Sequence, residues 1–158
     1  MKKILVTGSV GQIGSELTML LRKLYGNDNV VAGGNRTKPT GKLLESGPFE
    51  IVNCTDAQQV ADVVKKYDID TIYHLAAILS GVAEAKPNLA WDVNITGLYN
   101  ILEVARENKL LRIYCPSSMA AFGPTTPKVD TPQQTVLEPN TMYGLTKVSG
   151  ELLNNYYV

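Results

Sequence analysis

The sequence has few of the residues that mark metal-binding, disulfide-linked, membrane or nucleic-acid-binding proteins. Its 158 residues hold two cysteines, one histidine, and basic and acidic side chains that cancel at 15 each. Cys54 and Cys115 lie in apolar surroundings without metal-ligand spacing, which favours reduced thiols and no metal site. No apolar run approaches the roughly 18 residues that cross a bilayer, no charged leader is visible, and no basic face is patterned for nucleic acid. We therefore expect a cytoplasmic protein with a small-molecule substrate, no nucleic-acid partner and no membrane association.

The 44% apolar content predicts one substantial core, and we expect one domain over residues 1–158. Short apolar segments alternate with segments of helical period. The expected strands are 3–7, 29–33, 49–53, 70–77 and 111–116, the expected helices are 11–25, 57–67, 87–108 and from about 142, and 34–48 and 117–141 are expected loops. This alternation predicts an α/β fold, a doubly wound parallel sheet of the Rossmann type in three α/β/α layers. Ligands of such sheets bind beyond the carboxyl ends of the strands.

Three helices carry patterns that predict their packing. Asp56 with Gln59 resembles a capping box at the start of the second helix. We expect the last helix to present an apolar face formed by Leu145, Val148 and Leu152. In the first helix the apolar residues at three- and four-residue steps are Ile13, Leu17, Leu20, Leu21 and Leu24, and in the third the expected buried stripe is Ala90, Val93, Gly97, Leu98, Ile101, Val104 and Ala105.

Three glycines follow the first strand and open the first helix. Gly8, Gly11 and Gly14 have the spacing G-x-x-G-x-x-G. Without side chains, the first two let backbone approach a pyrophosphate and the third lets helix and strand pack closely, while the helix N-terminus supplies N–H donors. The pattern therefore indicates a dinucleotide site, and the alternative is an ordinary tight turn.

Tyr143 and Lys147 stand four residues apart, on one face of the predicted last helix. An adjacent ammonium favours a phenolate, which can take a proton from an alcohol while a hydride leaves to a nicotinamide. The alternative is a surface tyrosine beside a lysine that extends to solvent. Ser118, with Ser117 beside it, follows the fifth strand and can donate to the reacting oxygen; the alternative is a pair of hydroxyls that cap a loop.

Single polar and aromatic residues in apolar segments have two interpretations. Asn94 interrupts the stripe of the long helix, so its amide either satisfies neighbouring backbone or organises the hydrogen bonds of a site. His74, at the end of the fourth strand, is expected in the core, with a ligand as the alternative, and Trp91 is expected to pack against the protein, with a stacking platform as the alternative.

The glycine spacing together with the tyrosine and lysine resembles the short-chain dehydrogenase/reductases. Four further stretches resemble the L-threonine 3-dehydrogenases of the UDP-galactose-epimerase-like type: "GPFEIVN", "LAAILSGVAEAKPNLAWDVNITGLYN", "PSSMAAFGPTTPK" and "TPQQTVLEPNTMYG". The resemblance runs along essentially the whole chain but covers only the first half of such an enzyme. It implies oxidation of L-threonine to 2-amino-3-ketobutyrate with NAD.

The resemblance also implies roles for individual residues. Tyr143 would be the base, Lys147 would hold the cofactor ribose, and Ser118 would bind the hydroxyl being oxidised, while Ser80 would lie near the substrate and Asn94 would order the site. The expected substrate contacts are Ser80, Ser118 and Tyr143. The expected cofactor contacts are Gly8, Gly11, Gln12, Ile13, Gly14, Arg36, Asn53, Cys54, Leu75, Ala76, Ala77, Asn94 and Lys147.

The chain departs from the pattern of this family in three ways. Gly34, followed by Asn35 and Arg36, stands where an aspartate usually accepts the ribose hydroxyls of NAD; its absence beside an arginine leaves room for a 2′-phosphate, so NADP is an alternative cofactor. Asn53 stands where an aspartate commonly meets the adenine amino group, and its carbonyl can accept the same bond. The substrate lobe is missing after Val158, so we expect better cofactor binding than turnover.

Two other functions fit the same residues. A sugar-nucleotide epimerase or dehydratase would use Tyr143, Lys147 and Ser118 on a larger substrate. A non-catalytic dinucleotide-binding module would lack turnover altogether. By the resemblance we also expect a homodimer, formed through the long helix after Pro87 and the final helix.

Overall fold

The structure is a computed structural model that describes residues 3–157. The chain divides into two compact units. The first takes in the chain up to Ala76 together with Gly97–Pro116, and the second takes in Ala77–Thr96 and the chain from Ser117 onward. The expectation of a single domain stays a prediction.

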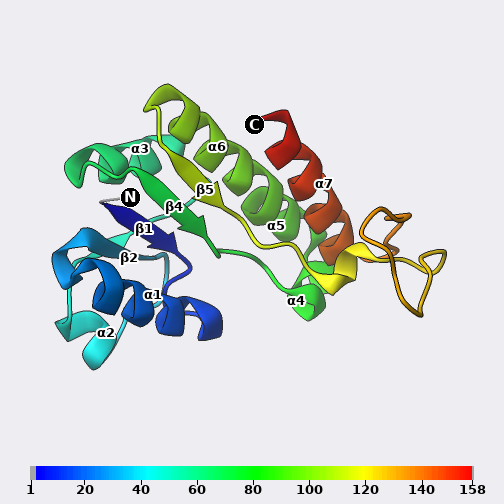
Figure 1. Cartoon of the computed structure of the whole chain (residues 1–158), viewed down its shortest axis with the longest axis horizontal. Coiled ribbons are helices and arrows are strands. Elements are labelled where there is room, and N and C mark those ends of the chain that lie inside the picture. Colours follow the sequence, from blue (N-terminus) through cyan, green and yellow to red (C-terminus); the bar gives the residue numbers. More distant parts are fainter. Residues whose placement is uncertain (1–2, 158) are drawn as a thin grey trace. The chain divides into compact units, whose positions relative to one another are not determined.

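The first unit is built on a five-stranded parallel sheet in the order β3-β2-β1-β4-β5. The strands are β1 (Ile4–Thr7), β2 (Val30–Gly34), β3 (Phe49–Ile51), β4 (Thr71–His74) and β5 (Arg112–Tyr114). Its helices are α1 (Gln12–Tyr25), the 3₁₀ turn η1 (Asn27–Asn29), α2 (Lys42–Glu45), α3 (Ala57–Lys66) and α6 (Gly97–Glu107). Figure 1 shows the sheet between α1 and α2 on one side and α3 and α6 on the other. The predicted Rossmann-type fold is thus confirmed.

Strand side chains fill the core of this unit, and β1 is buried over its whole length. Ile4, Val6 and Val30 pack with Leu21 of α1. His74 is 3% exposed, and its Nδ1 is 2.8 Å from the Thr7 hydroxyl oxygen, which agrees with its expected place in the core. Both faces of the central strands are therefore covered, which explains their continuous apolar runs.

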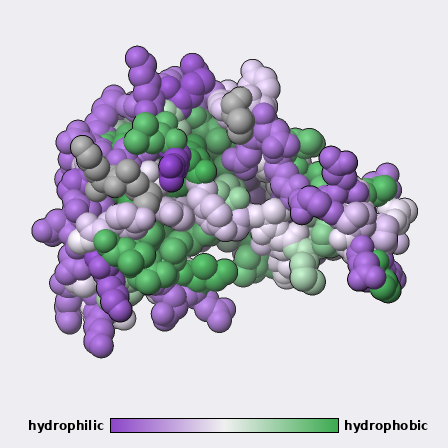
Figure 2. All heavy atoms as spheres, viewed as in Figure 1, coloured by the Kyte–Doolittle hydropathy of each residue, from purple (hydrophilic) through white to green (hydrophobic). Residues whose placement is uncertain are grey.

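Only part of the apolar stripe of α1 faces the core, where Leu21 is buried and Leu17 packs against the same cluster. Ile13, Leu20 and Leu24 are 71%, 53% and 63% exposed, and Figure 2 shows hydrophobic surface in the region of this helix. The buried residues of α1 are Gly14, Thr18, Leu21 and Arg22. The reason is geometric: Gly14 lies against the backbone of the glycine turn, and this contact fixes which side of the helix faces the sheet.

The start of α3 follows its predicted cap only in part. Asp56 Oδ1 accepts a hydrogen bond from Gln59 N at 3.0 Å, as expected of an N-cap. The Gln59 side chain reaches further back than in a capping box and accepts from Asn53 N at 2.5 Å. Gln59 therefore fixes the backbone at the end of the segment that follows β3.

The second unit is helical. It contains α4 (Ser80–Ala85), α5 (Pro87–Trp91), the π-helical turn η2 (Asp92–Thr96), the 3₁₀ turn η3 (Met119–Ala121) and α7 (Met142–Tyr156). The helix α4, which begins at Ser80, is not among the helices expected from the sequence. The long helix predicted at 87–108 is present as α5, η2 and α6, and its expected stripe is buried except for Val93, which is half-buried.

The apolar face expected on α7 is not its buried face, since Leu145 and Leu152 are 42% and 65% exposed and the buried residues are Gly144, Thr146 and Gly150. One expectation for this unit is wrong. Trp91 is 47% exposed rather than packed. Across residues 3–157, no helix is both long and apolar enough to span a bilayer, and no cluster of three or more potential metal ligands is found.

Candidate dinucleotide-binding and catalytic site

The glycine turn has a backbone shape that other residues cannot take. Gly8 has φ +70°, and Gly11 N donates to Gly8 O at 3.0 Å. A Cβ on Gly8 would stand 2.7 Å from Ala76 N, and one on Gly14 would stand 2.2 Å from Gly8 O. Both Ala76 N and Gly8 O are backbone atoms, so neither can move away by a change of side-chain rotamer. The turn therefore requires glycine at both positions for conformation and for close approach.

The N-terminus of α1 opens directly from this turn. Gly11 is its N-cap, no side chain caps it, and no acidic residue occupies the first turn. Gly11, Gln12 and Ile13 are exposed. Uncapped N–H groups with the positive end of a helix dipole form a binding place for a phosphate. The residues of the first unit thus fit the pyrophosphate of a dinucleotide.

The carboxyl ends of three strands meet at the turn. Ser9 donates to Gly33 O from both its N and its Oγ, at 3.0 Å each, which ties the turn to the end of β2. Leu75 N donates to Thr7 O at 3.1 Å, which places the residues after β4 beside the end of β1. Since the chain runs from β1 through β2 to β3 on one side and then returns to β4 on the other side of β1, this edge is the switch point where ligands of such folds bind.

Asn53 and Cys54 follow β3 and are held by the protein itself. Asn53 Oδ1 accepts from Thr55 N at 3.2 Å and from Thr55 Oγ1 at 2.9 Å, so the carbonyl expected to meet an adenine already has two donors. Cys54 O accepts from Asn100 Nδ2 at 3.0 Å. Burial raises the pKa of the Cys54 thiol to about 11, so the thiol is neutral and unreactive at physiological pH.

In the second unit, α7 carries Tyr143 and Lys147. Both side chains are half-buried, and Lys147 Nζ lies 5.5 Å from the centroid of the Tyr143 ring. The helix begins at Thr141, whose side chain accepts from Gly144 N at 3.1 Å. The predicted one-face arrangement of the phenol and the ammonium is therefore present.

Gly144 brings the Ser118 segment against α7. A Cβ at this position would stand 2.2 Å from Ala120 O of η3, so only glycine lets the two backbones approach this closely. Ser118 is the N-cap of η3, and its Oγ accepts from Ala120 N at 3.2 Å. The bond uses the Ser118 oxygen as an acceptor and leaves its hydroxyl hydrogen available to donate. Ser117 Oγ instead donates to Glu151 of α7.

Asn94 connects two other segments to the same helix. Its Oδ1 accepts from Ile78 N at 2.7 Å, and its Nδ2 donates to Ile78 O and to Thr146 Oγ1, each at 3.0 Å. The Thr146 hydroxyl in turn donates to Tyr143 O at 2.8 Å. Asn94 thus satisfies neighbouring backbone and also links to the residue between Tyr143 and Lys147, in a π-helical turn of the kind often found at functional sites.

Ser80 is exposed at the start of α4. Glu84 of the same helix accepts from Met142 N at 2.6 Å, which joins α4 to the start of α7. A carboxylate at a helix N-terminus is favourable, since it meets the positive end of the helix dipole. Four elements of this unit, α4, α5, η2 and η3, therefore pack around α7.

The motif residues that the sequence predicted fall into two groups, one in each unit. The first is the glycine turn with the strand ends, and the second is Tyr143, Lys147, Ser118 and Asn94 around α7. A comparison with protein families matches residues 4–158 to the NAD dependent epimerase/dehydratase family. The chain belongs to that family. This epimerase/dehydratase domain carries both groups in the order and spacing described above.

Relatives of this epimerase/dehydratase domain are about twice as long. An uncharacterized epimerase/dehydratase of Staphylococcus saprophyticus is 54% identical over 157 residues, which is 99% of this chain and 49% of the relative. The structure of L-threonine dehydrogenase from Clostridium difficile is 56% identical with a TM-score of 0.95, over 99% of this chain and 49% of that one. A GalE-like L-threonine dehydrogenase from Cupriavidus necator, in its holo form, is 46% identical with a TM-score of 0.92, over 98% and 50%. The chain thus spans about half the length of its relatives.

Sequence reasoning missed several residues that build the site. Gly144 carried a usable signal, because glycine inside a helix costs about 1 kcal/mol relative to alanine and so points to close packing. Glu84 and Thr146 carried none, since their roles are hydrogen bonds to residues distant in sequence.

Proposed function

We propose that this chain is the dinucleotide-binding half of a dehydrogenase that oxidises L-threonine at its β-hydroxyl to 2-amino-3-ketobutyrate. The glycine turn carries this proposal: Gly8 and Gly14 permit close backbone approaches that a Cβ would block, directly before an uncapped helix N-terminus. The choice of L-threonine rests on the four sequence blocks and on the similarity to L-threonine dehydrogenases at 46–56% identity.

The chemistry proposed for the chain uses three side chains of the second unit. The phenol oxygen of Tyr143 takes the proton of the substrate hydroxyl as general base, and Lys147 Nζ lies 5.5 Å from the centroid of the Tyr143 ring. The Ser118 hydroxyl donates to the oxygen being oxidised, since its own oxygen is occupied by Ala120 N. A bound nicotinamide dinucleotide would supply the acceptor for the hydride that leaves the carbon bearing the hydroxyl. Asn94 is a positioning residue that acts through Thr146.

Substrate oxidation tests the proposed activity. With L-threonine, the absorbance of reduced nicotinamide is followed. With a UDP-sugar, the product is followed by chromatography, because an epimerase or dehydratase returns the hydride and accumulates no reduced nicotinamide. Both assays use the chain alone and the chain joined to the second half of the Clostridium difficile relative. Oxidation of L-threonine in either form supports the proposal. Reaction only with a UDP-sugar would favour the epimerase or dehydratase alternative, and binding without turnover in both forms would favour the non-catalytic module.

Replacing Gly14 with alanine tests the binding half of the proposal. The new methyl group would collide with Gly8 O, so the turn must open, and we expect dinucleotide affinity in calorimetric titration to fall by about tenfold or more. Gly81→Ala is the control, because nothing lies within 4 Å of its Cβ position. Circular dichroism checks that both variants are folded. Equal affinity in Gly14→Ala and the unchanged chain would contradict the assignment of the turn.

We further propose that the chain forms a homodimer through its second unit. Trp91 of α5 and Leu145 and Leu152 of α7 are large apolar side chains that are 47%, 42% and 65% exposed. Burying such side chains favours association. Sedimentation at several concentrations should show dimers, and Leu152→Glu should shift the protein toward monomer. Tyr156→Glu, a change at an 80% exposed side chain of the same helix, tests whether added charge alone has this effect.

A further inference from the structure

The end of β2 is fixed beside the glycine turn. Ser9 holds Gly33 O with two hydrogen bonds of 3.0 Å, and Gly34 O accepts from Val52 N at 2.8 Å. In doubly wound sheets the residue about 20 positions after the glycine motif meets the 2′-position of the adenosine ribose. Gly34 and the exposed residues after it occupy that place in this chain.

No carboxylate is available to accept the ribose hydroxyls there. A Cβ on Gly34 would stand 3.0 Å from Phe49 Cε2, from Thr37 O and from Val10 Cγ2, so the position is closed to an acidic side chain unless neighbours move. The first acid after β2 is Glu45, in α2. Glu50 of β3 is engaged by Lys66 Nζ and by the Tyr67 hydroxyl, each at 2.6 Å.

The segment carries cations instead. Arg36, Lys38 and Lys42 are exposed, and no hydrogen bond or ion pair with another residue of the described chain occupies them. A guanidinium binds phosphate oxygens through two parallel N–H bonds, which a lysine cannot do. Arg36 stands two residues beyond the end of β2, which is the place from which an arginine accommodates a 2′-phosphate.

The segment is anchored by the protein. Arg22 of α1 donates to Leu43 O at 2.6 Å, to Ser46 Oγ at 2.9 Å and to Pro48 O at 2.7 Å. These bonds fix the chain between α2 and β3, and the β2 ladder fixes the segment's other end. The cations therefore stand on a segment held at both ends, which lowers the entropy lost on binding.

From these observations we infer that the chain prefers the 2′-phosphorylated dinucleotide, NADP(H), to NAD(H), and that Arg36 binds the 2′-phosphate. The inference rests on the proposed function, since it needs a dinucleotide in the glycine turn. The inferred cofactor differs from NAD, which is the cofactor named in the description of the family. Charge and space at the end of β2 act together: the acid that would favour NAD is absent, and its place is closed.

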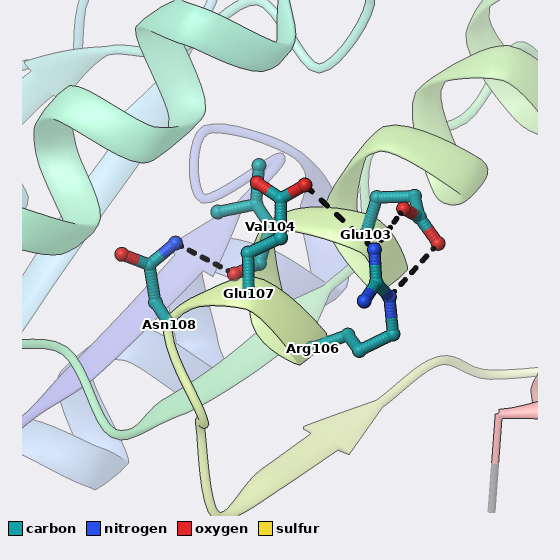
Figure 3. A network of polar contacts seen from close by, with 5 residues as sticks. All are labelled: Glu103, Val104, Arg106, Glu107 and Asn108. Atoms are coloured by element: carbon teal, nitrogen blue, oxygen red, sulfur yellow. Dashed lines mark hydrogen bonds and ion pairs between the residues drawn. The ribbon is translucent and has the colours of Figure 1, made fainter.

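Binding titrations with NADPH and NADH test the inference without turnover. We expect the unchanged chain to bind NADPH about tenfold more tightly, and Arg36→Gln to remove that difference by weakening NADPH alone. Arg106→Gln is the matched control, because that guanidinium, at the end of α6, is engaged by Glu103 at 2.7 Å and by Glu107 at 3.7 Å (Figure 3). It should leave both affinities unchanged.

Adenosine 2′,5′-bisphosphate and 5′-AMP probe the phosphate site by itself. The bisphosphate should bind more tightly than 5′-AMP, and only its affinity should fall in Arg36→Gln. Tighter binding of NADH than of NADPH, or equal loss of both in Arg36→Gln, would overturn the inference and leave the proposed function standing. Binding of neither dinucleotide would overturn the proposed function itself.

Discussion

Replacing Tyr143 with phenylalanine should lower L-threonine oxidation by about 10²- to 10⁴-fold, the contribution typical of a general base. The variant removes only the hydroxyl oxygen that is proposed to take the substrate proton. The ring keeps its place beside Lys147, and the helix keeps its bonds at Thr141 and Thr146. Dinucleotide affinity should stay within about twofold, because the phosphates are held by the glycine turn. The measurement is turnover of the chain joined to the second half of the Clostridium difficile relative, together with calorimetric titration.

Tyr156→Phe is the matched control for this prediction. It makes the same chemical change on the same helix, at a side chain that is 80% exposed and packs edge-on against Tyr157. It should leave turnover unchanged. Full activity in Tyr143→Phe would remove the phenol from the proposed chemistry, whereas loss of dinucleotide binding would show that the substitution disturbs more than one oxygen atom.

Replacing Arg22 with methionine should lower the free energy of unfolding by about 3–5 kcal/mol, since it leaves several buried acceptors without a donor. Arg22 is 2% exposed, and burial lowers its pKa. Its guanidinium donates to the carbonyl oxygens of Val30, Leu43 and Pro48 and to Ser46 Oγ. Methionine fills similar volume but donates no hydrogen bond. Urea denaturation followed by circular dichroism measures the loss.

Two further variants separate the hydrogen bonds of Arg22 from its bulk and charge. Arg22→Lys keeps the charge but presents a single ammonium, so it should lose less than the methionine variant. Arg106→Met removes an exposed guanidinium and should change stability by no more than about 0.5 kcal/mol. A loss below about 1 kcal/mol in Arg22→Met would mean that water replaces the missing donors.

Arg22 also links stability to the proposed choice of dinucleotide. Its hydrogen bonds hold the end of the segment between β2 and β3 in place. Gly47 makes room for the guanidinium, because a Cβ at that position would stand 2.8 Å from Arg22 Nε. Arg22→Lys, if folded, should therefore weaken NADPH more than NADH. The sequence shows Arg22 only as one more charged residue of an amphipathic helix, and nothing in its spacing predicts burial.

The sequence by itself determined the alternation of strands and helices, the glycine turn, and the tyrosine and lysine on one face of a helix. Each depends on contacts between residues close in the chain: period, capping, and backbone that admits only glycine. The burial of the long helix was likewise predicted nearly residue by residue, since residues at three- and four-residue steps share one face of a helix.

Only the tertiary structure decided which sides of α1 and α7 are buried. In α1 Ile13, Leu20 and Leu24 are exposed while Leu21 is buried, because Gly14 must meet the Gly8 backbone and so sets the rotation of the helix. In α7 small residues are buried, because the η3 backbone approaches at Gly144. The donors of Arg22 and the amide of Asn94 likewise find partners far along the chain. Such contacts depend on where backbone atoms of distant segments lie in space, and the spacing of residues along the chain does not predict those positions.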